Sequence, residues 1–70
     1  SESALTIYES LFSKPTIRIE EVSKLLNVSV STAGRLLNKL VGEDILKNLN
    51  NKKKDKIFVY QKYIDIFNQE

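Results

Sequence analysis

Several residue types that carry specialised chemistry are missing from this chain. Its 70 residues include no cysteine and no histidine. Without cysteine the chain forms no disulfide, and without either residue it lacks the ligands of a structural zinc site. The absence of histidine also removes the usual base that activates a serine or threonine nucleophile. We therefore expect no metal, no cofactor and no catalytic residue, and we expect that this chain is not itself an enzyme.

Size and hydropathy set further limits. A chain of 70 residues makes one small domain, residues 1–70, which buries only roughly 60% of the surface that its unfolded form exposes. No apolar run approaches the roughly 18 residues of a membrane helix, so we expect no membrane partner. The lack of cysteine fits a reducing compartment, and we expect a cytoplasmic protein.

Proline and glycine are scarce, with one and two copies. Pro15 ends a first helix expected over residues 3–13, where apolar residues recur at helical spacing. These are Ala4, Leu5, Tyr8, Leu11 and Phe12, with Ile7 nearby. Gly42 suits a left-handed residue that closes a later helix. Gly34 lies inside that helix, on its polar face, where glycine costs roughly 1 kcal/mol relative to alanine. It either permits close approach of a nucleic-acid backbone or another helix, or is simply tolerated.

The segment 28–42 has the signature of a capped helix. Ser29 is an N-cap residue, because its hydroxyl accepts a hydrogen bond from a free backbone N–H of the first turn. From Val30 onward the apolar residues recur at steps of three and four, which places them on one stripe facing a core. The stripe consists of Ala33, Leu36, Leu37, Leu40 and Val41.

A second helix and a hairpin complete the pattern. We expect a helix over residues 19–26, with Val22, Leu25 and Leu26 buried and Asn27 as its left-handed end. A three-residue turn, 27–29, then joins two helices as in a helix-turn-helix, with Val28 in the corner. Residues 17–19 read as a very short edge strand, 45–49 and 56–60 as two strands, and 50–55 as a polar tip. Tyr63, Ile64 and Phe67 predict a last helix that covers the open end of the core.

These elements predict a mainly α fold with a small β-hairpin. Its architecture is a winged helix-turn-helix, with a three-helix core, a wing of two to three strands and a short C-terminal helix. Charge is distributed unevenly along this fold. Residues 1–28 carry three basic and four acidic groups, whereas residues 29–62 carry eight basic and three acidic groups. Positive charge concentrated on one part of a domain is typical of contact with a polyanion.

The candidate DNA-binding residues belong to two groups. The polar side of the third helix, with its cap, contributes Ser29, Ser31, Thr32, Arg35, Asn38 and Lys39, and the hairpin contributes Lys52, Lys53, Lys54 and Lys56. Arg35 is the best candidate, because a guanidinium binds guanine or phosphate in two places. The alternative is that both groups are solvated surface and that Ser29 only caps its helix.

A family resemblance extends over nearly the whole chain. It rests on K-P-T-I-R-I-E-E-V-S-K-L-L-N-V-S-V-S-T-A-G-R-L-L-N-K-L, followed by D-I-L-K and F-V-Y-Q-K-Y-I-D-I-F. This order resembles the C-terminal winged-helix domain of bacterial Fic-family proteins, whose name stands for filamentation induced by cAMP. The ending Tyr63–Phe67 is similar to the family's tyrosine-containing last helix. Arg18 departs from the pattern, because relatives commonly place a threonine or serine cap there.

The resemblance implies a non-catalytic module and a fragment of a longer protein. Fic enzymes transfer AMP or a related group from a nucleotide to a target hydroxyl, through a histidine-containing motif that this chain lacks. Three functions follow as hypotheses. In the first, the chain binds double-stranded DNA. In the second, it is an interaction or autoregulatory module that contacts a Fic catalytic domain or a second copy, through Tyr8 and Phe12 of the first helix or through the last helix. In the third, it is a free-standing small transcriptional regulator.

Overall fold

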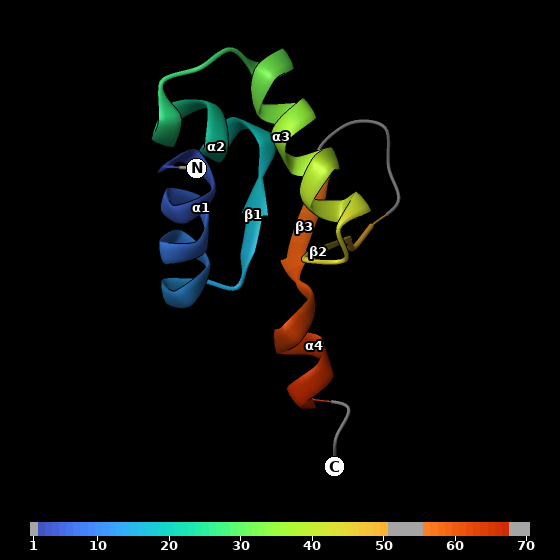
Figure 1. The fold of residues 1–70 in the computed structure, drawn as a ribbon. Coiled ribbons are helices and arrows are strands. Elements are labelled where there is room, and N and C mark those ends of the chain that lie inside the picture. Colours follow the sequence, from blue (N-terminus) through green and yellow to red (C-terminus); the bar gives the residue numbers. More distant parts are fainter. Residues whose placement is uncertain (1, 51–55, 68–70) are drawn as a thin grey trace.

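The computed structural model describes residues 2–50 and 56–67. Within these ranges the chain forms four helices and three strands (Figure 1). They are α1 (Glu2–Ser13), β1 (Thr16–Arg18), α2 (Ile19–Leu26), α3 (Val30–Gly42), β2 (Leu46–Asn48), β3 (Ile57–Tyr60) and α4 (Gln61–Phe67). The fold is mainly helical with a small antiparallel sheet, as predicted. None of the described helices is both long enough and apolar enough to span a membrane.

The three strands form one sheet in the order β1-β3-β2. Both pairings are antiparallel, and Ile17 of β1 and Asn48 of β2 flank Phe58 of β3. The predicted edge position of the first strand is confirmed, although it covers residues 16–18 rather than 17–19. The hairpin strands are shorter than predicted, at 46–48 and 57–60. Of the expected tip, residues 51–55 lie outside the described part of the chain.

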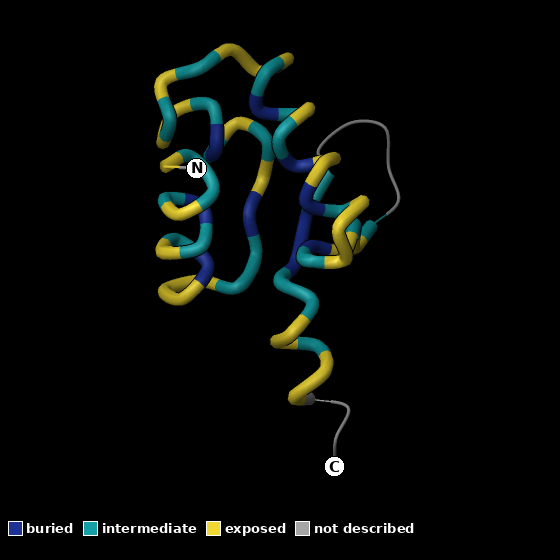
Figure 2. Tube along the Cα trace, viewed as in Figure 1, coloured by how far each residue is buried: buried dark blue, intermediate teal, exposed yellow. Residues whose placement is uncertain are grey.

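The core lies between α1, α2, α3 and one face of the sheet (Figure 2). Each of these elements contributes at least one buried apolar side chain, and together they form one cluster. The cluster contains Ile7, Leu11, Ile17, Val22, Ala33, Leu37, Leu40, Leu46 and Phe58. Burial of this surface is the main favourable contribution to folding in a domain without disulfides.

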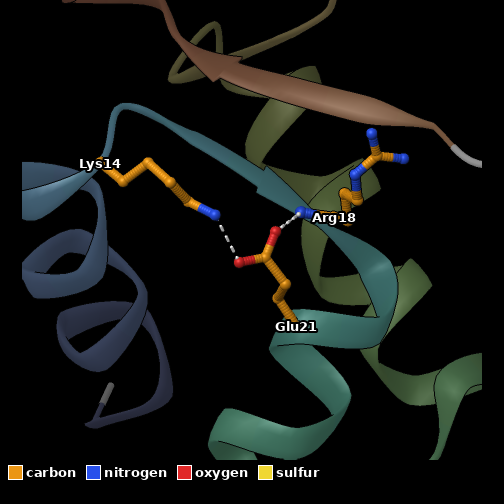
Figure 3. A network of polar contacts seen from close by, with 3 residues as sticks. All are labelled: Lys14, Arg18 and Glu21. Carbon is orange, nitrogen blue, oxygen red and sulfur yellow. Dashed lines mark hydrogen bonds and ion pairs between the residues drawn. The ribbon is translucent and has the colours of Figure 1, made fainter.

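The start of α2 does not depend on residue 18 as a side-chain cap. The Arg18 guanidinium carries only donors, so it cannot accept a hydrogen bond from the first turn. Instead, the Glu21 carboxylate accepts the Arg18 backbone N–H at 3.0 Å. The other oxygen of Glu21 accepts the Lys14 ammonium at 2.8 Å (Figure 3). A residue inside the helix therefore provides the cap and also ties α2 to the end of α1.

Helices α2 and α3 are each closed by a residue in the left-handed conformation, but only the end of α2 was predicted correctly. Asn27 closes α2 with φ 56°, as expected. The prediction for Gly42 is wrong, because α3 continues through Gly42 and no glycine has a positive φ. Asp44 takes the left-handed conformation instead, with φ 61°. Its N–H bonds to the Val41 carbonyl, and the next N–H reaches back to Leu40, both at 3.0 Å. This is a Schellman closure two residues later than expected.

The burial of several apolar residues also differs from prediction. Leu25 is 46% exposed rather than buried, and the α1 stripe is centred on Ile7 and Leu11. The last helix does not cover the core as expected, since α4 extends away from the body (Figure 1) and contributes nothing to the core cluster. Helical spacing fixes which residues share a face. It does not fix the direction in which the chain leaves β3.

Candidate nucleic-acid interface

The first turn of α3 is held by a small group of polar side chains. Ser29 has an extended backbone, and its Oγ accepts the Thr32 N–H at 3.1 Å, which confirms the predicted cap. The Ser29 hydroxyl also donates to Thr32 Oγ1 at 3.0 Å, and Arg35 Nη2 approaches the same oxygen at 3.5 Å. The cap, the threonine and the arginine therefore lie together at the positive end of the helix dipole.

The polar side of α3 faces solvent. We call it the outer face of α3, and it comprises Ser29, Ser31, Thr32, Arg35, Asn38 and Lys39. Thr32 is half-buried and the other five are exposed. The opposite side of the helix carries Ala33, Leu37 and Leu40, which are buried in the core. The outer face is therefore not covered by any described segment of the chain.

The turn before α3 fixes how this helix is presented. Ser23 binds Val28 twice: its carbonyl accepts the Val28 N–H at 3.0 Å, and its hydroxyl donates to the Val28 carbonyl at 2.7 Å. The Val28 side chain packs against the core. The sequence pattern predicted Val28 in the corner but gave Ser23 no role. Serine hydroxyls bond readily to nearby backbone groups, and this tendency is the signal that could have identified Ser23.

Gly34 is not part of the outer face, contrary to prediction. A Cβ added there would meet Ile19 Cδ1 of α2 at 3.9 Å, which is an ordinary van der Waals contact. Close approach of another helix is therefore present at this point. It does not require a glycine, because a methyl group fits.

Positive charge on the outer face is available to a ligand. In the described part of the chain, Lys14 and Glu21 form an ion pair, whereas no described carboxylate pairs with Arg35 or Lys39. An unpaired cation interacts with a polyanion without first losing an internal partner. The outer face thus combines two cations with hydroxyl and amide groups that bind phosphates and base edges.

The predicted hairpin residues fall only in part within the described chain. Lys52, Lys53 and Lys54 lie outside the described residues, and Lys56 is half-buried. A further cation, Lys47, was not predicted; it is exposed on β2, a strand in contact with α3. The alternation of a buried Leu46 with an outward neighbour is the pattern that identifies it.

Comparisons of the chain with protein-family models, with curated proteins and with solved structures find no match. The resemblance to the Fic family therefore stays a prediction. Among the described residues there is also no group of three or more acidic side chains that could hold a metal ion. The physical character of the outer face of α3 is thus the basis for assigning a function.

Proposed function

We propose that this chain is a winged helix-turn-helix module that binds double-stranded DNA, with the outer face of α3 in the major groove. The observation that carries the proposal is the exposure of Arg35, Asn38 and Lys39 on the helix that follows a three-residue turn. The order of elements supports it, because α2, the turn and α3 are followed by an antiparallel hairpin. An α-helix with short polar side chains on one face suits the width of the major groove.

Each side chain has a specific part in this proposal. Arg35 binds guanine or a phosphate through two N–H groups, and Asn38 reads an adenine edge through its amide. Ser31 and Thr32 contact phosphates next to the N-terminus of α3, where the helix dipole favours negative charge. Lys39 adds a further phosphate contact. The hairpin lysines predicted from the sequence, Lys52, Lys53, Lys54 and Lys56, extend the contact along the backbone.

The proposal is tested by measuring the affinity for a random-sequence duplex over a series of salt concentrations. Each neutralised phosphate contributes a slope of roughly −0.9 to log affinity against log salt. Arg35→Ala should weaken binding and reduce the magnitude of this slope by about 0.9. The matched control is Lys24→Ala, which removes one positive charge from an exposed position on α2. Lys53→Ala reports on the predicted role of the tip.

Two results would count against the proposal. Affinity that does not change with salt would exclude phosphate contact as the source of binding. Equal losses in Arg35→Ala and Lys24→Ala would show that binding depends on net charge and not on the outer face of α3.

A further inference from the structure

A second surface of the molecule is apolar and lies away from the outer face of α3. Between the end of α1 and α4 there is a groove of about 230 Å³, lined by Leu11, Phe12, Tyr60, Tyr63, Ile66 and the stem of Lys62. We call it the α1–α4 groove. Its margins protrude as well, because Phe12 is 78% exposed and Ile66 is 68% exposed. Apolar side chains gathered in this way commonly mark a contact site for another protein.

The last helix is short in the described part of the chain. Helix α4 spans seven described residues, and β3, which directly precedes it, is the described element that it principally contacts. Isolated helices shorter than roughly 12 residues are marginal in water. A helix of this length with an exposed apolar side therefore gains stability when a second surface covers it.

We infer that the α1–α4 groove pairs with the same groove of a second copy, forming a two-fold symmetric dimer. An isologous contact needs one patch that is both concave and protruding, because each copy supplies the same surface. The α1–α4 groove has both parts: a hollow between the helices, and Phe12 and Ile66 at its margins. Across a two-fold axis, the protruding Ile66 of each copy enters the hollow of the other.

Charge at the margins agrees with self-association. Glu9 lies one turn before Phe12 on α1, and Lys62 lies one turn before Ile66 on α4. Both are exposed, and among the described residues neither forms an ion pair. Glu9 is therefore the acidic group beside Phe12, and Lys62 is the basic group that lines the groove, whereas the exposed Asp65 of α4 is not among the lining residues. When α4 of one copy lies against α1 of the other, Lys62 faces Glu9 twice, which favours this pairing over a like-charged one.

Pairing through this surface leaves the outer face of α3 free. Helix α4 and the beginning of α3 lie at opposite ends of the molecule (Figure 1). A dimer formed through α4 would carry two accessible α3 helices. The inference does not depend on DNA binding, because it rests on the apolar groove and its charges alone.

The experiment is analytical ultracentrifugation of the full 70-residue chain across a wide range of concentrations. The expected result is a reversible monomer–dimer equilibrium. Ile66→Ser should raise its dissociation constant roughly tenfold or more, since a buried isoleucine is lost from each half. The matched control is Leu49→Ser, because Leu49 is 53% exposed but lies outside the groove. This variant should associate like the original chain.

Charge reversal distinguishes a two-fold dimer from unspecific association. Glu9→Lys alone and Lys62→Glu alone should each weaken the dimer, and the double variant should restore it. Circular dichroism of each variant checks that the helices are retained. A chain that stays monomeric at all concentrations would overturn the inference. So would association that Ile66→Ser leaves unchanged, or a double variant that is no tighter than the single ones.

Discussion

Ser29 Oγ accepts the backbone N–H of Thr32 at 3.1 Å, and this contact sets the first turn of the helix on which the proposed interface lies. The hydroxyl is exposed, so its removal leaves no cavity. Ser29→Ala should therefore lower the free energy of unfolding by about 1 kcal/mol, which is the usual value of a lost N-cap. Urea unfolding followed by circular dichroism measures it.

Ser29→Asp separates the cap from the interface. Aspartate caps a helix as well as serine does, and its charge suits the positive end of the dipole. Stability should therefore be kept, while DNA affinity falls because a negative charge now stands beside the proposed phosphate contacts. A variant that loses stability, or that binds DNA as well as the original chain, would contradict this reading of Ser29.

Gly34→Ala should stabilise the protein. The helix is regular at this position, and the added methyl group meets Ile19 Cδ1 at an ordinary 3.9 Å. Replacing a helical glycine with alanine should raise the free energy of unfolding by about 0.5–1 kcal/mol. Gly42→Ala, where a Cβ meets nothing within 4 Å, is the control and should give a smaller gain because Gly42 is the last residue of α3. Destabilisation by Gly34→Ala would mean that α2 and α3 pack too tightly there for a methyl group.

Asp44→Gly should also raise stability. Asp44 has φ 61°, a conformation that glycine adopts without the steric cost of a Cβ. We expect a gain of roughly 0.5–1 kcal/mol in thermal or urea unfolding. Asn27→Gly provides the comparison, since Asn27 has a similar φ of 56° and asparagine tolerates it well. A loss of stability in Asp44→Gly would show that its side chain has a role beyond the turn.

Stability should decline in acid through Glu21. The hydrogen bond from Lys14 lowers the pKa of this carboxyl from its ordinary value, with further help from the Arg18 N–H and against the effect of partial burial. The pKa of Glu21 is lower in the folded chain than in the unfolded chain. Its contribution to the free energy of unfolding is therefore complete above the ordinary pKa of glutamate and is lost as pH falls through the folded pKa. Both side chains of the ion pair are substantially exposed, at 58% and 40%, so salt should weaken the effect.

Glu21→Gln should flatten this part of the stability profile when urea unfolding is repeated over a series of acidic pH values. The neighbouring Glu20→Gln, at an exposed position, should leave it in place. Equal profiles for the two variants would exclude the Lys14–Glu21 pair as the source of the acid dependence.

Local chemistry predicted much of the fold. The Ser29 cap and the bounds of α2 follow from side chains that act on their own neighbourhood, and the structure confirms them. The end of α3 was not predicted correctly from the sequence, because Gly42 is able to close a helix but Asp44 does so two residues later. The direction of α4 was not predicted correctly either. The sequence shows that it has an apolar side, but only the direction of β3 decides whether that side meets the core.

The candidate site was predictable to a similar degree. Helical periodicity placed Arg35, Asn38 and Lys39 on the polar side of α3, and the structure leaves them exposed. Periodicity failed for Gly34, because a glycine has no side chain that shows which way its position faces. A Cβ at this position would point towards Ile19. It also gave no reason to select Ser23, whose bonds to Val28 exist only once the turn has formed.

The central claim is that the outer face of α3 contacts DNA, and an NMR titration of the labelled domain with a short duplex tests it most directly. Amide shift changes should concentrate at Ser31, Arg35 and Asn38, and they should shrink when salt is added. The side chains of Arg35 and Lys39 should change with them. Shift changes that concentrate on α1 and α4, or a spectrum that the duplex leaves unchanged, would contradict the account.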